Sequence, residues 1–539
     1  MEHTATVLDP VMLEILSTRI LSIVDEAAKV VVRTSFSTLS NEANDFTCIL
    51  TDAEGNSLAQ NTGAIPSFIG SLPATVRHFL REFGVEGMKP GDVFITNNPW
   101  MGTGHLNDAT VVKPIYHGDR LVAFSAAAAH LPDVGGHIRS PVPREVFEEG
   151  IHIPLMHLLK EGVPDETLIR LFRNNVRTPD ESMGDIWALV GALELMQTRL
   201  IGVIEDYENL DISDLTRELI TRSEVAMREA IRTIPNGSYE ATMLTDGLAN
   251  PFELKVRITV RDDEIEADFD GTSPQQPRAI NVPFIYTYAM TAYALKAALL
   301  PDALNNEGLF RPIVVKAPEA SILSARYPAA VGGRAATGHY VPVIVFKALQ
   351  SIIPDRVVAG AGSPISIMNV AGTRPDGSTF ATVLFFNGGT GARPNKDGVN
   401  CLSWPSNISS TPVEIAERNN PLFFHHKRLR PDSGGDGKFR GGLGQDILVE
   451  IMADNISAIF VAERTKFGAP GFNGGADGGL ADVQINGKSI DNRVVHLLRE
   501  KDQVLIRTPG GGGYGDPSER DRQREQADMA QGYISDASS

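Results

Sequence analysis

Residues 110–129, TVVKPIYHGDRLVAFSAAAA, contain two apolar runs on either side of the turn sequence His117-Gly118-Asp119. This pattern predicts a β-hairpin with strands over 110–116 and 120–129. If the ladder is centred on this turn, the numbers of paired residues sum to about 237.

The open end of this hairpin gathers side chains that can bind metals. In the expected register residue 108 faces residue 129 and residue 107 faces residue 130. Asp108 is therefore expected beside His130, because the Cβ atoms of opposed residues are about 5 Å apart. His105 precedes Asp108 on the incoming loop, and Asp133 and His137 follow His130 along the chain.

The group His105, Asp108 and His130 predicts a divalent metal site. Imidazole and carboxylate together suit Zn²⁺, Mn²⁺ or Fe²⁺. Three protein ligands leave coordination positions for water or substrate, as catalysis requires. The alternative interpretation is that these are hydrogen-bonded loop residues at a strand end.

Composition excludes several classes of protein. The 539 residues include 67 acidic and 49 basic side chains, and the net charge of −18 repels nucleic-acid phosphates. Two cysteines cannot form a disulfide framework in such a chain, and neither lies in a zinc-binding CxxC pair. The chain starts without the pattern of a signal peptide, and no apolar run approaches about 20 residues. We therefore expect a cytoplasmic protein that does not span a membrane.

The remaining patterns predict a mixed α+β fold. Most of the helix is expected in the N-terminal half, and short strands between glycine-rich turns are expected in the C-terminal half. The clearest predicted helices cover residues 10–33, 73–83, 181–208, 212–234, 289–300 and 340–353. We expect an N-terminal α/β region with the metal hairpin, a central α+β region, a glycine-rich β region and a flexible tail, over residues 1–236, 237–400, 401–517 and 518–539.

Two glycine clusters, 433–444 and 508–517, admit two interpretations. Backbone N–H groups, with the cations Lys438 and Arg440, could cradle an anion in the first cluster. The interpretation that we favour is a set of tight turns needing positive φ angles. Neither cluster is a P-loop and no convincing dinucleotide fingerprint is present, so the sequence does not support ATP or NAD binding by this chain.

Over nearly its whole length the sequence resembles the hydantoinase B family. These are the B-type subunits of N-methylhydantoinases, 5-oxoprolinases, caprolactamases and acetone- or acetophenone-type carboxylases. The motifs that carry the resemblance are the 97–108 loop, HLPDVGG at 130–136, DFDGTS at 268–273, NNEG at 305–308, PVE at 412–414, SGG at 433–435 and the 508–517 segment.

The resemblance implies an ATP-dependent enzyme with two kinds of subunit, assembled as a heterotetramer or larger. An A-type partner would bind ATP and phosphorylate a carbonyl or lactam oxygen. In the carboxylase members a His-x-x-Asp and a later histidine hold a metal, and these match His105, Asp108 and His130. Asp133 would be a fourth ligand or would orient His130, and two further residues, His137 and Asn107, would lie around the ligands. Asn107 stands where the family more often has proline, so the pocket differs in shape.

Three functions are compatible with this resemblance. The first is hydrolysis of a small cyclic amide, such as a hydantoin, lactam or imide, with Asp133 or Asp45 as the base. The second is ATP-dependent carboxylation of a ketone at the same metal; the moderate length of the chain favours hydrolysis. The third is a scaffold subunit that has lost its metal and only supports the A-type subunit.

Overall fold

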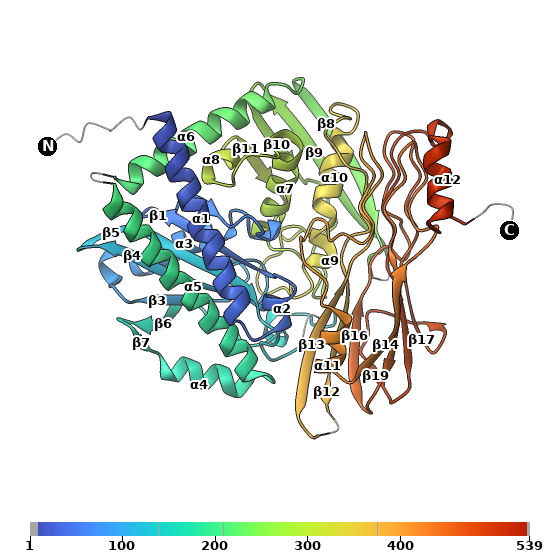
Figure 1. Ribbon diagram of the computed structural model, residues 1–539, viewed down its shortest axis with the longest axis horizontal. Helices are drawn as coiled ribbons and strands as arrows, with labels where there is room; N and C mark the ends of the chain where they lie inside the picture. The colour runs from blue at the N-terminus through green and yellow to red at the C-terminus, as the bar shows by residue number, and fades with distance from the viewer. Residues whose placement is uncertain (1–8, 138–139, 208–209, 249, 375, 536–539) are drawn as a thin grey trace.

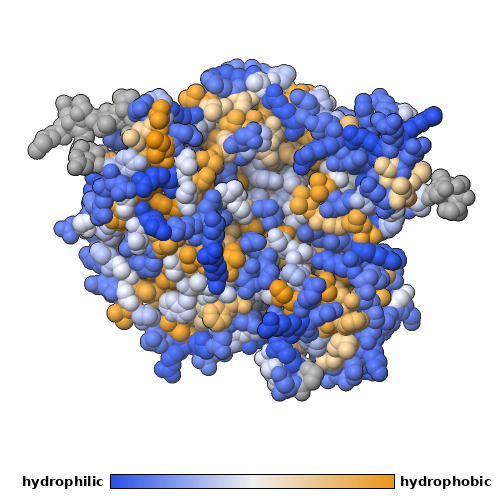
Figure 2. Space-filling model, in the orientation of Figure 1, coloured by the Kyte–Doolittle hydropathy of each residue, from blue (hydrophilic) through white to orange (hydrophobic). Residues whose placement is uncertain are grey.

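The computed structural model describes residues 9–137, 140–207, 210–248, 250–374 and 376–535. Within these residues helices surround or flank four sheets, which confirms the predicted mixed α+β class (Figure 1). On the face seen in Figure 2, hydrophilic residues predominate and hydrophobic residues are scattered among them.

The first sheet holds the predicted hairpin at its centre and has the strand order β2-β1-β5-β4-β3-β6-β7. Its strands are β1 (Phe46–Asp52), β2 (Ser57–Gln60), β3 (Val93–Thr96), β4 (Asp108–His117), β5 (Arg120–His130), β6 (Met156–Lys160) and β7 (Val163–Pro164). Helices α1 (Pro10–Thr34) and α5 (Pro179–Asp206) cover one face, and α3 (Ser71–Phe83) covers the other. Because both faces are buried, β4 and β5 are apolar on both sides.

The β4–β5 hairpin forms, but its register differs from the predicted one. His117 faces Arg120 beside the turn, as expected. A β-bulge then leaves Val122 as an extra residue in β5, so Asp108 faces His130 directly. The predicted pairings of residue 108 with 129 and of residue 107 with 130 are therefore wrong, because counting outward from a turn cannot reveal an extra residue in one strand.

Helix α5 is, among the described residues, the one helix long and apolar enough to cross a membrane. Half of that apolar window is buried inside the structure. The helix runs beside α1 (Figure 1), and its buried side chains share a core with α1, β4 and β5. Its apolar character is therefore explained by its place in the core beside the first sheet.

The second sheet has the order β11-β10-β9-β8 and packs against helices from the middle of the chain. Its strands are β8 (Gly237–Thr245), β9 (Phe252–Arg261), β10 (Glu264–Asp268) and β11 (Ile313–Lys316), and its helices include α6 (Ile212–Ile231), α7 (Phe284–Leu299) and α10 (Tyr340–Leu349). The short helix α9 (Ala335–Gly338) precedes α10 and follows a loop that reaches the first sheet.

Two further sheets share one core in the C-terminal third. They have the orders β13-β12-β16-β19 and β14-β15-β20-β17-β18. Their strands are β12 (Ser366–Thr373), β13 (Thr379–Phe386), β14 (Leu422–Leu429), β15 (Gln445–Ile451), β16 (Ile456–Val461), β17 (Asp482–Ile485), β18 (Lys488–Ser489), β19 (His496–Leu498) and β20 (Gln503–Arg507). The third sheet thus draws strands from both sides of residue 400.

The remaining helices are short, apart from one of ten residues. They are α2 (Thr38–Asn41), α4 (Glu166–Asn175), α8 (Glu307–Phe310), α11 (Val413–Asn419) and α12 (Arg522–Ala530). Helix α12 lies in the segment predicted as a flexible tail, and its Asp528 is buried. Residues 536–539 of that segment lie outside the described residues.

The glycine clusters form extended segments that run alongside one another between α10 and α12 (Figure 1). Gly511 accepts a hydrogen bond from the N–H of Gly435 and donates one to Gly442. A Cβ atom on Gly511 would lie 1.9 Å from the carbonyl oxygen of Thr390. The interpretation of clusters 433–444 and 508–517 as positive-φ turns is therefore wrong for every glycine except Gly515, whose φ is 75°, because close approach of neighbouring backbone is what requires glycine at the other positions.

Candidate metal centre

The ends of β4 and β5 bring His105, Asp108 and His130 together, as the sequence predicts. Asp108 Oδ1 lies 2.6 Å from His105 Nε2 and 2.9 Å from His130 Nδ1, and these two ring nitrogens are 3.2 Å apart. All three residues are at most 2% exposed. Three ligand atoms therefore converge on one point that is shielded from water.

Backbone hydrogen bonds on both sides of the hairpin hold these residues in place. The N–H of His130 donates to the carbonyl oxygen of Asp45 at 3.0 Å, which continues the pairing of β5 with β1. The N–H of Leu131 donates to the carbonyl oxygen of Asn107 at 2.8 Å. The side-chain amide of Asn97 donates to the carbonyl oxygen of Leu106 and so fixes the loop that carries His105.

The geometry of the group fits a divalent metal. Ligand atoms about 2.1 Å from one ion are separated by roughly 3.0 Å in an octahedron and 3.4 Å in a tetrahedron. The 3.2 Å between the two histidine nitrogens falls in this range, whereas the 2.9 Å and 2.6 Å from these nitrogens to Asp108 Oδ1 are hydrogen-bond distances below it, so the carboxylate would move outward by a few tenths of an ångström to share an ion with them. His105 Nδ1 lies 3.1 Å from the carbonyl oxygen of Gly332, which can only accept. Nδ1 therefore carries a proton, and Nε2 faces Asp108 Oδ1 at 2.6 Å, so a bound metal would take the place of the proton between Nε2 and the carboxylate.

The second carboxylate oxygen of Asp108 is occupied by residues that the sequence did not indicate. Arg334 Nη2 lies 2.6 Å from Asp108 Oδ2, and the hydroxyl of Thr103 donates to the same oxygen. Burial alone would raise the pKa of Asp108, but His105 and Arg334 hold it well below its ordinary value. Asp108 is thus an ionised carboxylate with one oxygen directed at the histidines.

Arg334 comes from the loop before α9, 226 residues away from Asp108 in the sequence. Its guanidinium stacks on the ring of Tyr286 at 4.4 Å and donates through Nε to the carbonyl oxygen of Thr103. Neither Arg334 nor Gly332 could be found from spacing, because both reach the hairpin only through the tertiary fold. The local sequence offers one signal, the pair of glycines before Arg334. A Cβ on Gly332 would lie 3.0 Å from Glu149 Oε1, so glycine at this position marks a close approach between this loop and another segment.

The structure does not bring two of the other predicted residues into the group. Asp133 is buried, but its carboxylate accepts from Arg177 Nη1 at 2.8 Å and from the N–H of Gly135. It therefore holds the loop after β5 and does not orient His130 as predicted. His137 is exposed, whereas the ligand group is buried. Asn107 and Asp45 are buried beside the ligands through the backbone contacts described above.

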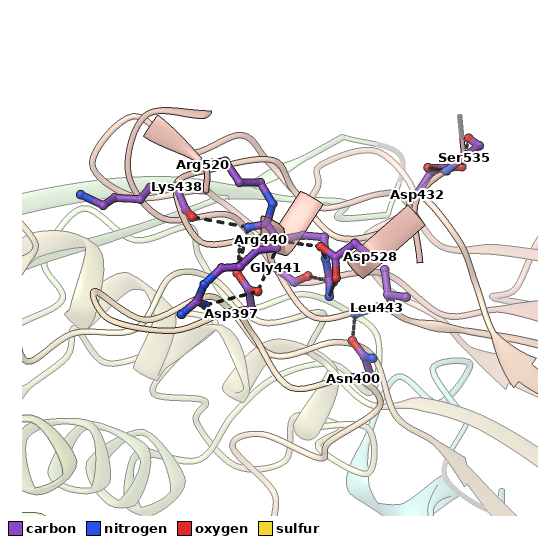
Figure 3. A network of polar contacts seen from close by, with 11 residues as sticks. Asp397, Asn400, Asp432, Lys438, Arg440, Gly441, Leu443, Arg520, Asp528 and Ser535 are labelled. Carbon is purple, nitrogen blue, oxygen red and sulfur yellow. Dashed lines mark hydrogen bonds and ion pairs between the residues drawn. The ribbon is translucent and has the colours of Figure 1, made fainter. Parts of the chain in front are cut away.

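The predicted anion loop has its two cations already paired with carboxylates. Arg440 Nε lies 3.0 Å from Asp528 Oδ2 of α12, and Lys438 Nζ lies 2.9 Å from Glu519 Oε2. Figure 3 shows Arg440 and Asp528 directed at each other, with Arg520 and Asp397 in the same network. The pair of Arg440 with Asp528 attaches α12 to the glycine-rich region, and the two pairings together leave little positive charge there for an anion.

A mixed α+β fold with a buried two-histidine, one-aspartate group defines a candidate metalloprotein of the kind that the sequence resembles. The model of the hydantoinase B/oxoprolinase family matches residues 9–517, and the chain belongs to that family. Caprolactamase subunit beta of Pseudomonas jessenii is 27% identical, over 98% of this chain and 94% of that protein.

Two solved structures share the fold. The crystal structure of the ATP-dependent caprolactamase from Pseudomonas jessenii has a TM-score of 0.89 and is 26% identical, covering 98% of this chain and 95% of that one. A nucleotide-free acetone carboxylase also has a TM-score of 0.89, covering 98% of this chain and 78% of that one. Its identity is 18%, so this second likeness concerns the fold alone.

Proposed function

We propose that this chain is the metal-holding B-type subunit of an ATP-dependent enzyme that hydrolyses a small cyclic amide, such as a hydantoin, lactam or imide. An A-type subunit would bind the ATP, in a heterotetramer or larger assembly. The observation that carries the proposal is the buried convergence of His105, Asp108 and His130. The family and the likeness to an ATP-dependent caprolactamase support the choice of cyclic amides.

The residues of the chain have distinct tasks in this function. His105, Asp108 and His130 would hold a Zn²⁺, Mn²⁺ or Fe²⁺ ion, which when bound supplies a Lewis acid for a carbonyl or phosphorylated oxygen and lowers the pKa of water. Arg334 occupies the outer oxygen of Asp108 and so restricts that carboxylate to one ligand atom. Asp45, which is buried next to His130, is our candidate for the base.

The division of labour between two subunits has a simple chemical basis. Hydrolysis of an unstrained cyclic amide can be thermodynamically unfavourable, and phosphorylation of the amide oxygen by the partner would open the carbonyl carbon to attack by water. The ring C–N bond would then break as the nitrogen takes up a proton, and a second water would hydrolyse the resulting acyl phosphate to the acid and phosphate. The sequence of this chain contains no P-loop and no convincing dinucleotide fingerprint. The ATP-binding site is therefore assigned to the partner.

Ketone carboxylation is the second candidate, and the shared fold with an acetone carboxylase is the observation that favours it. The test is to purify the chain together with its A-type partner and to measure ATP hydrolysis with panels of cyclic amides and ketones. Stimulation by an amide, with the ring-opened acid as product, is expected. Stimulation by ketones with uptake of labelled bicarbonate would favour carboxylation. Unchanged turnover in His105→Ala and His130→Ala would show that the chain is a scaffold.

A further inference from the structure

Glu149 is a buried carboxylate that lies two hydrogen bonds away from His105. It is 2% exposed, and its Oε1 accepts the N–H of Gly332 at 2.6 Å. The carbonyl oxygen of the same Gly332 accepts from His105 Nδ1 at 3.1 Å. Gly332 therefore links the Glu149 carboxylate to the histidine ring through its own N–H and carbonyl groups.

The backbone around Glu149 is held from two sides. On one side, Ile151 donates to the carbonyl oxygen of Val134 at 2.8 Å, and His137 donates to that of Glu148 at 3.1 Å. On the other side, Val146 donates to the carbonyl oxygen of Pro328 at 2.9 Å. The segment therefore lies between the loop that follows His130 and the loop that carries Gly332.

Close packing leaves this segment little room to shift. Gly150 has a φ of 142°, and a Cβ there would lie 2.4 Å from the carbonyl oxygen of Val134. A Cβ on Gly136 would lie 2.5 Å from the carbonyl carbon of Glu149. Such contacts fix the backbone position of Glu149. The length of the side chain therefore decides whether its carboxylate can accept the hydrogen bond of the Gly332 N–H.

We propose that Glu149 is a positioning residue for the metal centre: it holds Gly332 so that the carbonyl oxygen of Gly332 orients His105 and directs Nε2 toward Asp108 and His130. The proposal rests on the proposed function, because it requires that these side chains bind a metal. For this role the side chain must be long enough to place its acceptor oxygen at the N–H of Gly332, whereas the negative charge of the carboxylate is not needed. A hydrogen bond that orients a metal-binding histidine is worth about tenfold or more in metal affinity.

The test separates reach from charge with two variants of the full chain. Glu149→Gln keeps an acceptor oxygen at the same distance and removes the charge, whereas Glu149→Asp keeps the charge and shortens the side chain by one methylene. Affinity for Zn²⁺ alone is measured by competition with a chelator, and the absorption spectrum of the Co²⁺-loaded chain reports ligand geometry. Glu145→Asp is the matched control, because Glu145 is exposed in the same segment.

Glu149→Asp is expected to weaken Zn²⁺ binding about tenfold or more and to change the Co²⁺ spectrum, while Glu149→Gln and Glu145→Asp stay within about threefold of the wild type. Wild-type affinity and spectrum in Glu149→Asp would overturn the proposal, as would a larger loss in Glu149→Gln than in Glu149→Asp. If the wild-type chain binds no metal, the proposed metal function itself fails, and this result is distinct from a failure of Glu149 alone.

Discussion

Asp108 and His130 face each other at the open end of the β4–β5 hairpin, with 2.9 Å between Asp108 Oδ1 and His130 Nδ1. Directly opposed residues in a ladder point to the same face, whereas a shift of one residue sends them to opposite faces. The bulge at Val122 makes them directly opposed. One extra residue in β5 is therefore what places the aspartate and the histidine in a single site.

Removing either histidine is expected to abolish stoichiometric metal binding. His105→Ala and His130→Ala each remove one of three ligand atoms and leave Asp108 ionised beside a gap. The metal content of the purified full chain, measured by mass spectrometry, should fall at least about tenfold. His137→Ala is the matched control, because His137 is exposed and should leave the metal content unchanged. Full metal content in His130→Ala would rule out the assignment.

The free energy of unfolding is expected to fall as pH rises through neutrality, partly because of Glu463. Burial, assisted by Asp246, raises the pKa of Glu463 to about 8 from an ordinary value of 4.5. Between these pH values the unfolded chain releases a proton that the folded chain retains, so stability present below pH 4.5 is lost up to about pH 8. The slope from one such group is at most about 1.4 kcal/mol per pH unit.

Urea unfolding from pH 5 to pH 8.5 measures this component as a difference between variants. Glu463→Gln lacks the titrating group, so its free energy of unfolding should fall less steeply with pH than that of the wild type. Glu500→Gln alters an exposed carboxylate and serves as the control. Parallel pH profiles for Glu463→Gln and the wild type would contradict the assignment of a raised pKa to Glu463.

Gly511→Ala is expected to destabilise the chain by about 3 kcal/mol or more, because its Cβ would lie 1.9 Å from the carbonyl oxygen of Thr390. The comparison is Gly202→Ala in α5, where nothing lies within 4 Å of an added Cβ. That change should be neutral or stabilising by up to about 1 kcal/mol. Both values come from denaturant unfolding, and equal stabilities of the two variants would contradict the close-packing explanation.

Asp528→Asn is expected to loosen α12 without unfolding the rest of the chain. Arg440 is 4% exposed, so loss of its carboxylate partner leaves a buried cation at a local cost of about 3 kcal/mol. Hydrogen exchange should show faster exchange over residues 522–530. Glu525→Gln, an exposed change in the same helix, should have no such effect. Unchanged protection in Asp528→Asn would mean that other contacts hold the helix.

Local patterns in the sequence determined much of the fold. The structure contains the helices predicted over residues 10–33 and 181–208, as α1 and α5, and the hairpin turn predicted at 117–119. These elements could be predicted because capping, helical periodicity and turn formation depend on residues close together in the chain. The three candidate ligands were also available from the sequence, since Asp108 and His130 end the two strands of one hairpin and His105 lies on the loop just before it.

Only the tertiary structure decided the rest. The hairpin register depends on the bulge at Val122, beyond which β5 pairs with β1 and β4 without a further shift, and no local pattern marks Val122 as the extra residue. Arg334 and Gly332 reach the site from a loop more than 200 residues away in the sequence. The carboxylate of Asp133 accepts from Arg177 and does not join the two histidines and Asp108. A hydrogen bond between distant segments depends on how the layers pack, and that packing is a property of the whole core, which no short stretch of sequence contains.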